Sequence, residues 1–92
     1  MPKFLIEVPH DNNQEACDQA VRVFKQTGSH FLTNADWGCS DDIHKAWIII
    51  DVDNKNEALL IVPQPYREKA RAITLNKFAF DGTDESLNQH QT

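Results

Sequence analysis

The order of the hydrophobic patterns constrains this chain more than any other feature. In residues 3–8 the spacing is that of a β-strand, with Phe4, Ile6 and Val8 on one face and Leu5 and Glu7 on the other, and residues 13–27 carry apolar side chains at helical spacing. Two strand-like stretches then follow, and after them a short helix that begins near residue 53 and a last strand at residues 71–78. An order of strand, helix, strand, strand, helix and strand within one short chain predicts an α+β fold.

The two expected helices have recognisable starts. Asn12 precedes Glu15 by three residues, and Asn54 precedes Glu57 in the same way. An asparagine in the capping position with a glutamate three residues later is typical of a helix N-terminus. Gly28 supplies a residue that can adopt the left-handed conformation with which many helices end.

The order βαββαβ is that of the ferredoxin-like split βαβ, a four-stranded antiparallel sheet with two helices on one face. In this arrangement the first and third strands are central. The third strand, residues 43–52, is apolar on both faces as far as Asp51. Because helices cover only one face, Leu5, Trp47 and Ile49 would be left bare on the other. We therefore expect a homodimer through this sheet face, as in a dimeric α/β barrel, unless loops and the C-terminal segment cover it.

Composition sets further limits. The 92 residues fit a single domain, expected at residues 1–80, followed by a flexible polar tail at residues 81–92. A net charge of −5 argues against nucleic acid as a partner. No apolar run approaches the length of a membrane span, so we expect no membrane partner and a cytoplasmic location. Cys17 falls on the apolar face of the first helix, and we therefore expect no disulfide with Cys39.

A cluster of potential ligands surrounds the turn between the second and third strands, at residues 30–37 and 43–52. Cys39 and His44 are five residues apart across this turn, and Asp36 precedes it. A thiolate and an imidazole are good ligands for zinc, nickel or copper, and Asp36 would add an oxygen. The sequence therefore predicts a divalent transition metal, nickel or zinc, with His10 or His30 available to complete the site. Alternatively, Cys39 is an ordinary loop thiol and His44 a solvated residue at a strand end.

A second set of residues suits the mouth of a ligand cavity between the sheet and the helices. Trp37 lies at a strand end, and Tyr66 and Arg67 follow the break at Pro63 and Pro65. Arg67 is a suitable clamp for a carboxylate or phosphate, and His30 could act there as a base. Packing for Trp37 and a surface position for Arg67 and His30 are the alternatives.

The strand Phe4–Val8 together with the stretch His44–Ile49 after the turn resembles the small dimeric α/β-barrel proteins. Within that group the chain is loosely similar to short ferredoxin-like proteins, some of which bind nickel mainly through histidines. The nickel-binding histidines of those proteins cannot be matched residue by residue to His10, His30 or His44, so the resemblance assigns no metal ligand to this chain. Other members are cofactor-free monooxygenases or isomerases that use a histidine, tyrosine or acid in the cavity, and the fold does not choose among these functions.

Three functions remain open from the sequence. The first is a protein that binds a small ligand or a divalent transition metal without catalysis. The second is a small cofactor-independent enzyme that uses His44 or His30 with Asp36. The third is a structural or regulatory interaction module.

Overall fold

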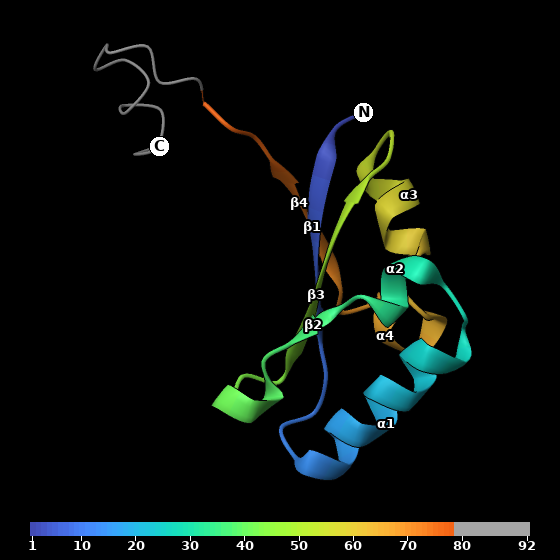
Figure 1. Ribbon diagram of the computed structural model, residues 1–92, viewed down its shortest axis with the longest axis vertical. Helices are drawn as coiled ribbons and strands as arrows, with labels where there is room; N and C mark the ends of the chain where they lie inside the picture. Colours follow the sequence, from blue (N-terminus) through green and yellow to red (C-terminus); the bar gives the residue numbers. More distant parts are fainter. Residues whose placement is uncertain (79–92) are drawn as a thin grey trace.

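A computed structural model describes residues 1–78; the tail expected at residues 81–92 lies outside the described residues. The described chain is α+β, with a four-stranded antiparallel sheet in the order β2-β3-β1-β4 and helices packed against one face (Figure 1). The strands are β1 Lys3–Pro9, β2 Asp36–Trp37, β3 Lys45–Asp51 and β4 Arg71–Leu75. The helices are α1 Gln14–Gln26, α2 His30–Thr33, α3 Lys55–Leu60, α4 Gln64–Arg67 and the 3₁₀ turn η1 Cys39–Asp41.

The first and third strands lie at the centre of the sheet, which confirms the prediction. They pair antiparallel, with Ile6 opposite Ile48 and Leu5 opposite Ile49. Side chains alternate between the two faces of a strand, so one set of these residues faces the helices and the other set faces away. Ile6 and Ile48 are buried, whereas Ile49 is 59% exposed.

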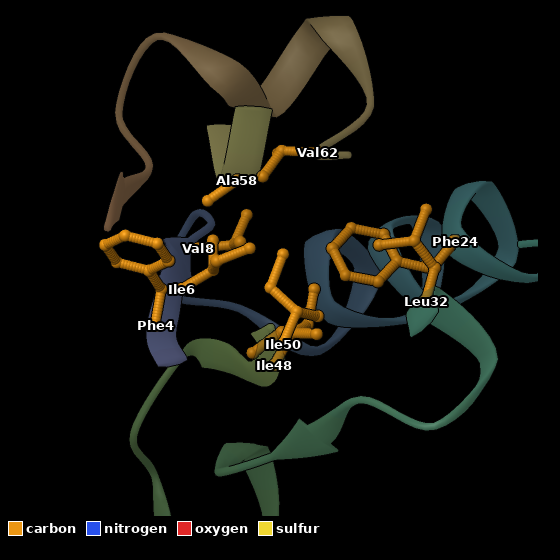
Figure 2. Close-up of a cluster of buried hydrophobic side chains, with 10 residues drawn as sticks. Phe4, Ile6, Val8, Phe24, Leu32, Ile48, Ile50, Ala58 and Val62 are labelled. Atoms are coloured by element: carbon orange, nitrogen blue, oxygen red, sulfur yellow. The ribbon is translucent and has the colours of Figure 1, made fainter. Parts of the chain in front are cut away.

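The core lies between the inner face of the sheet and the helices. Figure 2 shows Phe24 of α1, Leu32 of α2 and Ala58 of α3 arranged around the strand side chains. Phe24 is 1% exposed and its ring lies 4.9 Å, centroid to centroid, from that of Trp37. Burying a side chain of this size contributes about 3 kcal/mol to folding, which fixes α1 against the start of the hairpin between β2 and β3.

The helix termini follow the sequence signals closely. The Asn13 side chain accepts a 2.7 Å hydrogen bond from the Ala16 amide, so the cap of α1 is one residue later than the predicted Asn12. Asn54 caps α3 as predicted, accepting from the Glu57 amide at 2.9 Å. Gly28 adopts a φ of +69° directly after the end of α1, as expected of a left-handed helix stop.

The second strand is much shorter than predicted. In place of a strand over residues 30–37, residues His30–Thr33 form α2 and only Asp36–Trp37 pair with β3. The Thr33 hydroxyl and the Asn34 amide both donate to the His30 carbonyl, at 3.0 and 2.8 Å. Such local side-chain bonds to the backbone compete with strand pairing and hold one helical turn here.

The other side of the sheet, which we term the open face, is formed by the outward-facing residues of β1, β3 and β4. Its centre is apolar, because Leu5 lies between Ile49 and Ile73 in the strand register. Ion pairs border it, Lys3 with Asp51 and Glu7 with both Lys45 and Arg71. All four labelled helices lie on the opposite side of the sheet in Figure 1. Within residues 1–78, no helix has the length and apolar character needed to cross a membrane.

Candidate metal and thiol site

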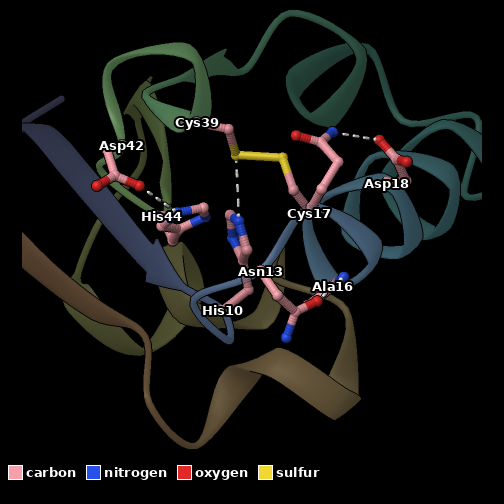
Figure 3. Close-up of a disulfide and its surroundings, with 9 residues drawn as sticks. His10, Asn13, Ala16, Cys17, Asp18, Cys39, Asp42 and His44 are labelled. Atoms are coloured by element: carbon pink, nitrogen blue, oxygen red, sulfur yellow. Dashed lines mark hydrogen bonds and ion pairs between the residues drawn. A yellow bond between two sulfur atoms is a disulfide. The ribbon is translucent and has the colours of Figure 1, made fainter.

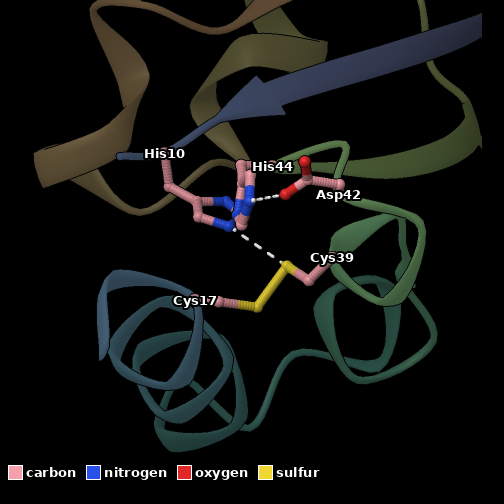
Figure 4. A network of polar contacts seen from close by, with 5 residues as sticks. All are labelled: His10, Cys17, Cys39, Asp42 and His44. Atoms are coloured by element: carbon pink, nitrogen blue, oxygen red, sulfur yellow. Dashed lines mark hydrogen bonds and ion pairs between the residues drawn. A yellow bond between two sulfur atoms is a disulfide. The ribbon is translucent and has the colours of Figure 1, made fainter. Parts of the chain in front are cut away.

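Two histidines meet at the end of the sheet where β1 stops and β3 starts. His10 directly follows β1, and His44 directly precedes β3. The His10 amide donates to the His44 carbonyl at 3.1 Å, which extends the antiparallel pairing by one step. The two rings are nearly perpendicular, with centroids 5.6 Å apart (Figure 4). Strand register therefore makes neighbours of two imidazoles that lie far apart in the sequence.

The turn between β2 and β3 brings Cys39 to the same place. Gly38 starts the turn; its amide donates to Lys45 and its carbonyl accepts from Ile43. A Cβ at Gly38 would lie 2.7 Å from the Ile43 carbonyl oxygen and 2.8 Å from the Trp47 ring, so only glycine fits without rearrangement. The tight turn directs Cys39 toward the histidines, and the His10 Nε2 atom lies 3.2 Å from the Cys39 sulfur.

Cys39 forms a disulfide with Cys17 of α1, which corrects the expectation that no disulfide would form (Figure 3). Their Cα atoms are 6.8 Å apart, and 22 positions separate them in the sequence. Cys17 is indeed on the buried side of α1, with 5% of its surface exposed. That side of the helix also meets the turn that carries Cys39, so burial of Cys17 and formation of the bond are compatible.

Three potential ligand residues converge here, namely His10, Cys39 and His44. Their ligand atoms all lie within 4.8 Å of one another, and each residue is partly buried. Asp36, the oxygen ligand suggested by the sequence, is an exposed residue of β2 and is not a member of this group. The histidine after β1 takes the third place instead.

The two ring nitrogens of His44 have different surroundings. Its Nε2 atom lies 3.2 Å from a carboxylate oxygen of Asp42. Its Nδ1 atom is buried and has no hydrogen-bond partner among the described residues. If Nε2 donates to Asp42, Nδ1 carries the lone pair of the neutral imidazole and is the nitrogen able to bind a cation.

Burial also affects His10. Loss of solvation lowers the pKa of the His10 imidazole, the neighbouring His44 lowers it further, and Asp11 acts weakly in the opposite direction. The lowered pKa favours the neutral ring at physiological pH. A neutral ring is the form that accepts a hydrogen bond or coordinates a metal.

His10 also lines a cavity of about 270 Å³. Tyr66, expected from the sequence at a ligand site, lines it, and burial raises the pKa of the Tyr66 hydroxyl. The remaining lining residues are Pro9, Asp11, Ala16, Gln19, Pro65, Glu68 and Lys69. This volume is close to the lower limit of cavities that hold small organic ligands, about 300 Å³, and small-ligand binding stays a prediction.

The other residues suggested for ligand binding have different surroundings. Trp37 packs between Phe24 and His10, with ring centroids 4.9 and 5.9 Å away. His30 is exposed on α2 beside Asn34. Arg67 donates to the Val62 carbonyl at 2.9 Å and to the Leu60 carbonyl at 3.3 Å, and so satisfies backbone groups at the end of α3.

Sequence reasoning gave Cys17 no place in the site and named His10 only as a possible contributor. A signal for His10 was present, because in an antiparallel pair the residue after one strand lies opposite the residue before the next. Using that signal requires the register between β1 and β3. Comparisons with protein-family models, with curated proteins and with solved structures each found no match for this chain.

Proposed function

We propose that the reduced protein binds one divalent transition metal ion, zinc or nickel, through His10, His44 and the thiolate of Cys39. The support is the convergence of three ligand atoms within 4.8 Å of one another. Ligand atoms around a tetrahedral zinc ion lie about 3.3–3.8 Å apart, given bond lengths of about 2.0–2.3 Å. Small side-chain rotations would thus be enough to close the site.

The observation that carries this proposal is the unpartnered Nδ1 atom of His44. A buried polar atom without a partner costs about 1–3 kcal/mol, and most such atoms in proteins are satisfied. A metal ion between the two histidines would satisfy this atom. Asp42 would then act on the far side of the ring, where a carboxylate commonly orients a metal-bound histidine.

Cys17 is not a member of the group whose ligand atoms lie within 4.8 Å of one another, but we propose it as a fourth ligand after a side-chain movement. Its sulfur is bonded to that of Cys39, so after reduction a second thiolate is present beside the first. Two thiolates and two imidazoles form a donor set typical of structural zinc sites, which have no open position for a substrate. We therefore propose that the protein binds the ion without catalysis. The ion would link α1, the end of β1 and the turn before β3.

We also propose that the domain is ferredoxin-like and dimeric. The sheet order β2-β3-β1-β4, with the first and third strands central, supports the first part. The exposed Ile49 at the centre of the open face supports the second.

Calorimetric titration with zinc and with nickel tests the metal proposal. The protein is kept reduced with a phosphine, which does not add competing thiols. We expect one ion per chain, and affinity lowered at least ~100-fold in His10→Ala, His44→Ala and Cys39→Ser, more than the loss of a residue that only orients a ligand. Asp36→Asn is the matched control, because this residue lies beside the turn but outside the ligand group. Equal weak binding by all five proteins would contradict the proposal.

A further inference from the structure

We infer that the oxidation state of Cys17 and Cys39 controls whether the metal site can be occupied. This inference rests on the proposed function. The sulfur of Cys39 lies 3.2 Å from the His10 nitrogen and is also bonded to Cys17. A sulfur atom in a disulfide has no thiolate charge, and the thiolate is the form that binds a metal. The disulfide and the metal site thus compete for one atom, and each state excludes the other.

The two cysteines differ in access. Cys17 is 5% exposed on the inner side of α1, whereas Cys39 is partly exposed on the turn. An oxidant from solution therefore reaches Cys39 first, because susceptibility follows thiolate character and exposure. Cys17, held next to it, has the position of the thiol that completes the disulfide.

The reaction balances with hydrogen peroxide as the two-electron oxidant. The Cys39 thiolate attacks one peroxide oxygen, the O–O bond breaks, and Cys39 becomes a sulfenic acid while hydroxide leaves. The Cys17 thiolate then attacks the Cys39 sulfur, the S–S bond forms, the S–O bond breaks, and a second hydroxide leaves. Two protons convert the hydroxides to water, the two thiolates have lost two electrons, and the metal ion is released with its charge unchanged.

The fold permits this exchange without opening. In the oxidised state the disulfide already joins α1 to the turn, and His10 and His44 lie against it (Figures 3 and 4). Zinc-bound sulfurs are about 3.8 Å apart, which follows from a Zn–S bond of about 2.3 Å. The two states therefore differ by a movement of a few ångströms at two side chains, and the same two segments are joined in both.

Mass action makes the coupling quantitative. An ion that binds only the reduced chain shifts the ratio of reduced to oxidised protein by a factor of one plus the free ion concentration over Kd. At a free zinc concentration of about 100 times Kd, this ratio should rise about 100-fold. A glutathione redox buffer with chelator-controlled free zinc measures that shift directly.

The deciding experiment uses the full chain, reduced and loaded with zinc. Hydrogen peroxide is added in substoichiometric steps; a colorimetric chelator reports released zinc, and intact mass reports the loss of two hydrogens per disulfide. We expect one zinc ion released for each disulfide formed, and recovery of binding after reduction by a phosphine. A chain that binds zinc when reduced and keeps it when fully oxidised overturns the switch alone. A reduced chain that binds no zinc overturns the proposed function as well.

A matched pair of variants tests the order of attack. In Cys17→Ser the sulfenic acid at Cys39 cannot be resolved, so a dimedone probe should label that residue after peroxide treatment. In Cys39→Ser, the buried Cys17 should be labelled at least several-fold more slowly. Equal labelling of the two would overturn the assigned order. The zinc-release measurement on the unmodified chain needs neither variant, so it decides the switch even if one of them does not fold.

Discussion

The open face and the candidate metal and thiol site share strands β1 and β3 but depend on different forces. On the open face, Leu5 and Ile49 are held opposite each other by strand register, and such cross-strand pairs contribute about 0.2–1 kcal/mol each. At the site, a covalent bond joins Cys39 to a helix. One region thus consists of many weak, replaceable contacts, and the other depends on a single bond and a few polar atoms.

This difference predicts which single substitutions should have large effects. A substitution on the open face leaves the neighbouring contacts in place, so in an isolated chain its effect is small. A substitution at the site removes either the bond or a polar partner that no other residue replaces. Variants in the two regions should therefore separate clearly in the size of their effects.

Removal of the disulfide should have the largest effect on stability. Under oxidising conditions and without metal, Cys39→Ser should lower the free energy of unfolding by about 3 kcal/mol, because the bond closes a loop in the unfolded chain between residues 22 positions apart. For a domain of this size that corresponds to a fall in Tm of roughly 12–24 °C. Thermal unfolding followed by circular dichroism measures it.

The control is the same protein with the bond reduced and no metal present. Reduced wild type and Cys39→Ser should unfold within about 0.5 kcal/mol of each other, because a serine at a partly exposed position changes little else. A Cys39→Ser variant as stable as the oxidised wild type would show that the bond does not form in solution.

The two regions also differ in how well the sequence predicts them. Period-two alternation placed Leu5, Trp47 and Ile49 together on the face away from the helices, because the face of a strand residue is a local property. The two asparagine caps are local as well. The site needed the register of β1 against β3 and the path of the turn, both of which are set by tertiary packing. Hence Cys39 and His44 were identified from their spacing, whereas the disulfide was not.

The second strand illustrates the same limit. Residues 30–37 were predicted to form a strand, yet the hydrogen bonds of Thr33 and Asn34 to the His30 carbonyl stabilise a helical turn. That turn also buries Leu32 in the core. A choice between helix and strand that depends on one buried side chain and two local hydrogen bonds is difficult to predict from periodicity alone.

On the open face, the largest effect is expected on association. We expect sedimentation equilibrium to give about twice the 10.5 kDa mass of the chain. Ile49→Lys should weaken the dimer by about 2 kcal/mol, roughly 30-fold, because a charge would be buried without a partner. Each folded monomer should keep its stability, since Ile49 is 59% exposed in the single chain.

Leu60→Lys is the matched control for the open face. Leu60 is 64% exposed, a fraction similar to that of Ile49, but it lies at the end of α3 on the other side of the sheet. Its replacement should leave the sedimentation profile unchanged. Equal effects of both variants, or a monomer at micromolar concentration for the wild type, would rule out a dimer through this face.

The turn before β3 should tolerate change less well than a turn elsewhere. Gly38→Ala should lower the free energy of unfolding by about 2 kcal/mol, because the new methyl group overlaps the Ile43 carbonyl and the Trp47 ring. Gly28→Ala is the comparison. Apart from its chain neighbours, no atom lies within 4 Å of the position that the new methyl group would take. Its cost of about 1 kcal/mol therefore comes only from the φ of +69°, which strains any residue with a Cβ. Only Gly38→Ala should also weaken zinc binding, because it displaces Cys39.

The smallest predicted effect concerns Glu7 at the edge of the open face. A hydrogen bond from the Trp47 indole at 3.3 Å lowers the pKa of the Glu7 carboxyl most; burial acts in the opposite direction, and Lys45 and Arg71 lower it further. Since the folded-state pKa lies below the unfolded value of about 4.5, the ionised carboxylate stabilises the fold fully above that pH. The contribution is lost as the pH falls through the lowered pKa.

Urea unfolding between pH 3 and pH 7, compared for wild type and Glu7→Gln, measures this contribution. Glutamine keeps an oxygen that can accept the bond from Trp47, so the variant removes mainly the charge. We expect a difference of about 0.5–1 kcal/mol at pH 7, because the Lys45 side chain is 41% exposed and that of Arg71 71% exposed, so solvent screens their attraction. The stability difference between wild type and Glu7→Gln should shrink toward pH 3 and in high salt. Asp51→Asn, which breaks the more exposed ion pair with Lys3, should change stability less than Glu7→Gln does. A difference for Glu7→Gln that stays constant with pH would mean that the contacts of Glu7 with its neighbours act through packing rather than through charge.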